Sequence, residues 1–212
     1  MKLTANQPLL AILSIFLFLT SCQKEIDLQD PVNPGNGTGN NNNSIIGEYN
    51  FVGTIASTYS SVTVSDQGSE LKAVSVSGYI TQNNVGTVKI TASDIIFMAV
   101  GYSIDTTVNL KTYLDGVLFD DSDLPYMLTV PPTNTTNPYT RINIDSLNIT
   151  GALGVPDPSG ATPTGPVGIK TSWSGDTLLL KIASSFTQNI SQGGVPGTLT
   201  GSVNGIAKLK KR

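Results

Sequence analysis

The stretch Val108-Asn-Leu-Lys-Thr-Tyr-Leu-Asp-Gly-Val-Leu-Phe119 decides the fold class of this chain. Val108, Leu110 and Leu114 alternate with Asn, Lys and Tyr, which is the period of a strand with one buried face. Asp115-Gly116 follows, and this dipeptide favours a type I′ turn because both central residues need positive φ. The apolar residues up to Phe119 supply the return strand. The stretch therefore predicts a β-hairpin.

Strand patterns of the same period recur on both sides of this hairpin. The residues that mark them are Tyr49, Phe51 and Ile55; Val62 and Val64; Val74, Val76 and Ile80 on one face; Val88 and Ile90; Tyr126, Leu128 and Val130; Ile142 and Ile144; Trp173; Leu178, Leu180 and Ile182; and Leu199, Val203 and Ala207. Turn residues separate them at Asp66-Gln-Gly68, Asn83-Asn84 and Gly175-Asp176, and Pro131-Pro132 is expected to end a strand.

The run Ile95-Ile-Phe-Met-Ala-Val100 has no polar alternation. It predicts a strand that is buried on both faces or covered by a neighbouring segment. A short helix is the alternative, because so short a run does not separate strand from helix by periodicity. After Ile45 the chain lacks the apolar spacing of a long helix. About eight to ten strands, mostly linked by hairpins, predict an all-β domain of residues 45–212. An antiparallel meander that closes into a barrel is expected, and a β-sandwich is the alternative.

The N-terminal segment has the three parts of an export signal. Lys2 precedes an apolar core from Leu9 to Leu19, and small residues then lead to Cys22. The core is shorter than the about 20 residues that a permanent membrane helix needs. Leu19-Thr-Ser-Cys22 resembles the lipobox of bacterial lipoproteins, which implies a signal peptide of residues 1–21, acyl chains on Cys22 and a membrane anchor. A buried free cysteine after an uncleaved helix is the alternative.

Residues 22–44 are predicted to form a disordered tether, because Pro, Gly and Asn leave little to bury. Gln23-Lys-Glu-Ile-Asp27 resembles the signal for surface display in lipoproteins of the Bacteroidota type. This resemblance implies an outer-membrane protein at the cell surface, with the periplasmic face as the alternative location. A solvated charged tether is the other interpretation of the same residues.

Composition excludes several chemistries. The 212 residues contain 12 Lys and Arg, 15 Asp and Glu and no His, for a net charge of −3. The only basic cluster, Lys208 to Arg212, is expected to be a solvated strand end, so no nucleic-acid partner is predicted. The absence of His excludes His-based triads and His-ligated zinc. The densest acidic group, Asp115, Asp120, Asp121 and Asp123, lacks EF-hand spacing and predicts a soluble hairpin tip. We expect no metal, no cofactor and no catalytic residue.

The aromatic residues of the domain either pack its core or line a ligand cavity. Core packing is the commoner outcome, because a barrel of about eight strands fills its interior with side chains or holds one small ligand. The candidates for a ligand-binding role are Tyr49, Phe51, Tyr79, Phe97, Tyr102, Phe119, Tyr126 and Trp173.

Two motifs carry a resemblance to a known fold. Gly47-Glu-Tyr49 resembles the Gly-x-Trp opening of lipocalin-type barrels, with Tyr in place of Trp, and Trp173-Ser-Gly-Asp-Thr-Leu-Leu-Leu180 looks like the late strand pair of lipocalin-like lipoproteins. The order of signal, tether and all-β domain is similar to uncharacterised lipoproteins of the Bacteroidota. The resemblance implies a lipocalin-like barrel on a lipid anchor.

Three functions follow from these observations. The first is an anchored, non-enzymatic lipoprotein whose barrel binds a small apolar or glycan ligand. The second is a structural or accessory subunit of a cell-envelope complex, with an envelope protein as partner. The third is a hydrolase that uses two carboxylates in a cleft. They are ranked in this order, and the first two are nearly equal.

Overall fold

The computed structural model describes residues 44–150, 167–192 and 194–212, and all regular structure in these ranges is strand. The predicted all-β class is confirmed. The predicted signal peptide, Cys22 and nearly all of the tether lie outside the described residues. The strands are β1 (Gly47–Asp66), β2 (Ser69–Ile80), β3 (Gln82–Ile90), β4 (Asp94–Leu114), β5 (Val117–Arg141), β6 (Ser146–Ile149), β7 (Val167–Ser174), β8 (Thr177–Gln192) and β9 (Val195–Lys211).

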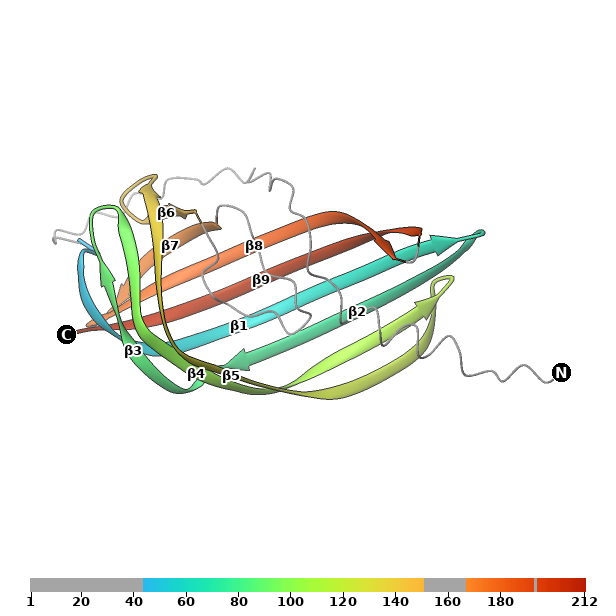
Figure 1. The fold of residues 1–212 in the computed structure, drawn as a ribbon, viewed down its shortest axis with the longest axis horizontal. Coiled ribbons are helices and arrows are strands. Elements are labelled where there is room, and N and C mark those ends of the chain that lie inside the picture. Colours follow the sequence, from blue (N-terminus) through green and yellow to red (C-terminus); the bar gives the residue numbers. More distant parts are fainter. Residues whose placement is uncertain (1–43, 151–166, 193) are drawn as a thin grey trace.

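These strands form one antiparallel sheet in the order β2-β1-β3-β4-β5-β6-β7-β8-β9. Two further pairings, β1 with β9 and β2 with β4, close the sheet into a barrel-like ring (Figure 1). In the described part of the chain, no helix is long and apolar enough to cross a membrane.

Among the described strands, the ring is complete at only one end. β5 pairs with β6 only through Tyr139–Arg141, and β7 pairs with β8 only as far as Ile182. Figure 1 shows the short strands β3, β6 and β7 gathered at this end, where the C terminus lies, while the long strands extend away from it. We call the complete ring the closed end. The curved sheet that continues from it, made of β8, β9, β1, β2, β4 and β5, is the open half.

An apolar core fills the closed end. The Tyr49 side chain is fully buried there, its hydroxyl donates a hydrogen bond to the Ile45 carbonyl at 2.6 Å, and its ring centroid lies 6.2 Å from that of Trp173. Burial of each large aliphatic side chain contributes about 1.5–3 kcal/mol, so this cluster is the main source of stability. Its other fully buried members include Val88, Ile90, Ile95, Leu147, Ile149, Leu178 and Leu209.

Three predicted turns are confirmed. Asp115 and Gly116 have φ values of 50° and 78°, as a type I′ turn requires, and Leu114 pairs with Val117. Asp66-Gln-Gly68 joins β1 to β2, and Gly175-Asp176 joins β7 to β8. The predicted turn at Asn83-Asn84 is wrong. Both residues lie within β3, and β2 and β3 each pair with β1, so they form no hairpin.

Several predicted strand ends are also wrong. The segments around Phe51 and Val62 belong to one continuous β1, and β5 runs through Pro131-Pro132 to Arg141. Proline is tolerated here because one side of β5 pairs with no described strand before Tyr139, so a missing N–H breaks no bond of a described ladder on that side. Ile142 and Ile144 do not form a strand. Both lie in the bend before β6, and both side chains are exposed. The bend is held by hydrogen bonds from the backbone N–H groups of Ile142 and Asn143 to the Ser146 carbonyl.

The apolar residues of β2 lie on the outer wall of the ring. Val74, Val76 and Ile80 do share a face, but Val76 and Ile80 are 47% and 62% exposed. The buried face carries Ser75, Ser77 and Tyr79 instead. Alternation divides the residues of a strand between two faces, but it does not tell which face points inward. In β2 the face with the polar side chains is the inner one.

The run Ile95–Val100 is a strand, as predicted, and lies in β4. Its predicted burial on both faces is wrong, because only Ile95 and Val100 are buried and Ala99 is exposed. A ring made of a single sheet has one interior, and no second layer of described strands covers the outer side of β4. Ala99 has a φ of 48° at an irregularity in the β4 ladder.

Gly86 allows β3 to cross this irregularity. Its φ is 99°, and a Cβ at this position would lie 2.4 Å from the Ala99 carbonyl oxygen and 2.6 Å from the Val100 Cα. Both contacts are with backbone, which cannot move aside as a side-chain end can. Gly86 is therefore required where β3 inserts between β1 and β4 to complete the ring.

We expect Gly86→Ala to lower the free energy of unfolding by about 3 kcal/mol, because it adds both a backbone clash and positive-φ strain. Denaturant unfolding followed by the fluorescence of Trp173, the single Trp, measures the change. Gly78→Ala is the matched control, since its nearest atom would be 3.8 Å away, and it should cost less than about 1 kcal/mol. Equal stability of the two variants would contradict this role of Gly86.

Candidate functional site

The interior of the ring contains a small cavity between two walls. β1, β8 and β9 supply Phe51, Leu180 and Ala207, and β4 and β5 supply Tyr102 and Thr135 among others. Its volume is about 110 Å³. A pocket that holds a whole small-molecule ligand usually measures about 300 Å³ or more. The closed end alone therefore has room for only part of a ligand.

Tyr102 lies at the boundary between this cavity and the open half. It packs against the core of the closed end and also against a second cluster formed by Ala56, Tyr79 and Ile104. Its ring centroid is 6.0 Å from that of Phe51. Burial, and to a lesser extent the neighbouring Tyr126 hydroxyl, raise the pKa of Tyr102 to about 12. The phenol is therefore neutral throughout the physiological range.

Beyond Tyr102, the inner surface is lined by hydroxyl groups. Thr58 bonds to Ser77 across the β1–β2 ladder at 2.9 Å, and Ser60 bonds to Ser75 at 2.8 Å. Ser184 of β8 lies on the same face, because both it and Thr58 are opposite Val203 of β9. All five hydroxyl side chains are buried. We call Thr58, Ser60, Ser75, Ser77 and Ser184 the hydroxyl floor.

The interior as a whole is uncharged. Among the described residues, every buried side chain that carries a polar group belongs to Thr, Ser, Asn or Tyr, and none of these is ionic. Burial of an unpaired charge is costly, so an interior of this kind excludes ions and accepts neutral groups. The surface therefore changes from an apolar, aromatic cavity to a neutral polar floor without any ionic group between them.

The aromatic candidates divide into three sets. Phe51, Tyr79, Tyr102 and Tyr126 lie along the interior at the boundary, and Phe97 joins them at the cavity. Tyr49 and Trp173 belong to the core of the closed end. Phe119 is 68% exposed near the tip of the β4–β5 hairpin, away from the interior aromatic set.

Sequence reasoning missed the hydroxyl floor. The available signal was the alternation of Ser75 and Ser77 with Val74 and Val76, and of Thr58 and Ser60 with Tyr59. In each case the larger apolar side chain suggested the buried face, and the small hydroxyl residue occupies it. Small side chains fit the concave surface of a strongly curved sheet, where side chains converge.

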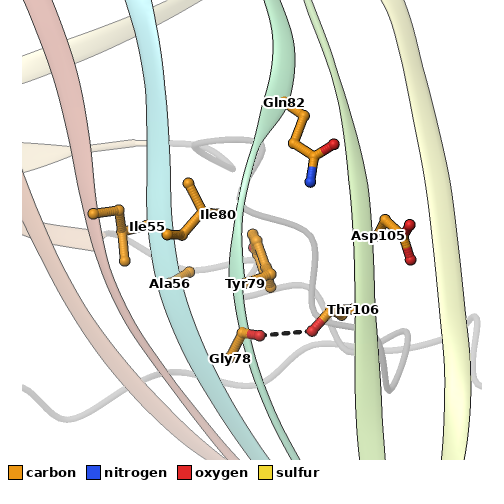
Figure 2. Close-up of a pocket in the computed structure, with 8 residues that line it drawn as sticks. All are labelled: Ile55, Ala56, Gly78, Tyr79, Ile80, Gln82, Asp105 and Thr106. Atoms are coloured by element: carbon orange, nitrogen blue, oxygen red, sulfur yellow. Dashed lines mark hydrogen bonds between the residues drawn. The ribbon is translucent and has the colours of Figure 1, made fainter.

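A second depression lies in the wall where β2 stops pairing with β4. Its volume is about 430 Å³, and it is lined by Ile55, Tyr79, Ile80, Gln82 and Asp105 among others. Figure 2 shows the hydrogen bond that spans this gap, in which the Thr106 hydroxyl donates to the Gly78 carbonyl at 2.7 Å. Asp105 is the single carboxylate among the described residues of its lining, so these residues do not provide the paired carboxylates of a hydrolase.

The acidic group of the β4–β5 hairpin has the wrong properties for catalysis. Asn109 donates from one amide nitrogen to Asp121 at 2.9 Å and to Asp123 at 3.0 Å, on the exposed outer wall. The Asn109 bond and then the Lys111 ammonium lower the pKa of Asp121. A general acid needs a raised pKa, so this pair does not support the hydrolase. Within the described ranges, no group of three acidic side chains is placed to hold a metal ion.

Comparison with protein-family models, with curated proteins and with solved structures found no match.

The raised pKa of Tyr102 predicts a loss of stability in alkali. Unfolded Tyr102 releases its proton near pH 10.0 and the folded residue near pH 12, so the unfolded state binds fewer protons between these values. The free energy of unfolding should therefore fall as the pH rises from 10 to 12. Tyr102→Phe should flatten this slope in denaturant titrations at several pH values. An unchanged slope would contradict the assignment.

Proposed function

We propose that this chain is an exported lipoprotein, held at the outer membrane by acyl chains on Cys22, and that its half-open barrel binds a small neutral ligand, either apolar or a glycan. The lipobox at Leu19–Cys22 and the Gln23–Asp27 segment support the anchor and the location. The charge-free interior supports the ligand class, and it is the observation on which the binding function rests.

The apolar cavity suits an apolar part of the ligand, and the hydroxyl floor suits a polar part. The cavity beside Phe51 and Tyr102 has room for a short apolar group, and its burial contributes about 0.8 kcal/mol for each methylene. The hydroxyl floor supplies groups that both donate and accept hydrogen bonds, which suits ether, ester or sugar oxygens. A carboxylate or phosphate would lose its hydration there without gaining a cation.

The anchor predicts a specific effect of Cys22→Ser. Because the thiol is the attachment point, the variant should incorporate no labelled palmitate and should leave the membrane fraction. Metabolic labelling and fractionation measure both outcomes. Ser21→Ala is the control, because it retains the thiol and a small residue before it. Equal labelling of the Cys22→Ser variant would contradict the lipoprotein assignment.

The cavity predicts which variant loses the ligand. Small molecules released from the protein of a native membrane fraction should include one enriched compound, identified by mass spectrometry. Ala207→Leu adds three carbons beside the cavity and should reduce its recovery at least about 10-fold. Ala183→Leu, on the exposed outer face of the same hairpin, is the control. No enriched compound, or parental recovery from Ala207→Leu, would contradict ligand binding in the cavity.

The β4–β5 hairpin favours a second function, as an accessory subunit of a cell-envelope complex. Val117 is 70% exposed and Phe119 is 68% exposed, beside Leu118 at the same tip. Clustered exposed apolar side chains of this size mark a contact surface. Recovery of an envelope protein with the parent chain, but not with Phe119→Ser, would support this function over ligand binding.

A further inference from the structure

The register of β7, β8 and β9 brings together lysines that are far apart in the sequence. Lys170 of β7 lies directly opposite Lys181 of β8. Ile206 of β9 is the residue opposite Lys181, so Lys208 is the diagonal neighbour of Lys181. Opposed and diagonal side chains of a ladder are close enough to interact. We call Lys170, Lys181 and Lys208 the lysine row.

The lysine row lies on the outer wall of the ring. In each of the three strands a buried residue of the interior directly neighbours the lysine, so the period of two turns the lysine outward. These neighbours are Ile169, Leu180 and Leu209. Lys170 and Lys181 are exposed, and Lys208 is half-buried. Leu179 and Ile206, both partly exposed, share this face, so the wall combines positive charge with some apolar surface.

The lysine row has no acidic partner in the ion pairs of the described residues. Like charges directly opposite each other, as Lys170 and Lys181 are, repel and weaken a ladder. An anion bound at the row would remove this repulsion. The described ion pairs instead join Lys89 with Glu48, Lys111 with Asp121 and Lys210 with Asp176.

Charge is also segregated along the long axis of the domain. Among the described residues, the closed end carries eight basic and four acidic side chains, and the open half carries two basic and seven acidic ones. The minority charges are Glu48, Asp94, Asp145 and Asp176 at the closed end, and Lys72 and Lys111 in the open half. An asymmetric distribution of this kind orients a protein in front of a charged surface. The closed end is thus the part that an anionic surface attracts.

The described chain begins at the same end. Tyr49, near the start of β1, pairs with Lys211, and Figure 1 shows the C terminus at this end. Residues 23–43 separate Cys22 from the described chain. The disordered coil that their sequence predicts has a root-mean-square reach of about 25 Å, whereas the 20 residues of β1 extend about 66 Å. Acyl chains on Cys22 would therefore hold the closed end near the bilayer and the tip of the β4–β5 hairpin away from it.

We propose that the lysine row binds the anionic headgroups of the membrane that holds the anchor, so that the outer wall of β7, β8 and β9 rests against the bilayer. This inference rests on the proposed anchor and not on the proposed ligand. Lysine ammonium groups pair with lipid phosphates as point charges, and Leu179 and Ile206 meet the apolar boundary beneath the headgroups. Lys211 and Arg212 extend the basic surface to the rim of the closed end.

The attraction is large enough to orient the domain. Each lysine near an anionic membrane strengthens binding about 5-fold, so the three lysines of the row together contribute about 100-fold, and salt screens the effect. The anchor places a lipid surface next to this wall. For this reason a lipid, and not an acidic protein, is the proposed partner.

Fluorescence quenching in lipid nanodiscs tests which face of the lipidated chain meets the bilayer. The fluorophore is attached to one added cysteine, either Asn204→Cys on the exposed outer face of β9 or Phe119→Cys at the hairpin tip. Acylation blocks the thiol of Cys22 in both. In discs of phosphatidylcholine with phosphatidylglycerol, a headgroup quencher should act on position 204 at least about 5-fold more than on position 119. In phosphatidylcholine alone, or in about 1 M salt, the ratio should fall below about 2-fold.

A charge variant tests the lysine row itself. The combination of Lys170→Gln, Lys181→Gln and Lys208→Gln should also reduce the ratio in anionic discs below about 2-fold, because three ammonium groups are lost. Lys72→Gln with Lys111→Gln is the matched control in the open half and should leave the ratio unchanged. Circular dichroism spectra that match the parent show that both variants fold.

Equal quenching at 204 and 119 in anionic discs overturns the proposal, and so does a parental ratio in the triple variant. Both results leave the anchor intact, because the chain in the discs carries its acyl chains. A chain that incorporates no labelled palmitate overturns the anchor and this inference together. Lysine acetylation in discs and in intact cells separates the two classes of partner. Protection of the lysine row in anionic discs supports the lipid, whereas protection in cells alone assigns the row to an acidic protein and overturns the proposal.

Discussion

The pairing of β1 with β9 is the interaction on which the rest of the structure depends. It joins Tyr49–Val64 near the start of the described chain to Gly197–Lys211 at its end, and it converts a meander into a ring. Without it, the aliphatic side chains of the closed end would face water, because a single sheet has no second layer to cover them. Its bulge between Phe51 and Gly53 directly follows the segment Gly47–Asn50 that also pairs with β3.

Because the described strands close into a ring at one end only, the interior is divided into an apolar part and a polar part. Where the ring is complete, side chains converge from all directions and exclude water, so Tyr49, Ile90 and Leu178 can be large and apolar. Where β3, β6 and β7 are absent, the curved sheet has an inner face but no opposing wall among the described strands. Paired hydroxyls such as Ser60 with Ser75 suit this position, because they satisfy each other whether or not another molecule is present.

The same division supports the ligand proposal. The cavity at the end of the closed core and the neutral hydroxyl floor lie side by side with Tyr102 between them, which is the arrangement that the proposed neutral ligand would need.

The amino-acid sequence by itself determined the all-β class, the hairpins at Gln67-Gly68 and Asp115-Gly116, and the approximate number of strands, because period-two alternation and positive-φ turn residues are local properties. Only the tertiary structure decided which face of β2 points inward, that β3 pairs with β1 rather than β2, and that Pro131-Pro132 does not end β5. Those outcomes depend on ring closure between strands more than a hundred residues apart. Alternation divides a strand into two faces, but only the curvature of the closed sheet assigns one of them to the interior.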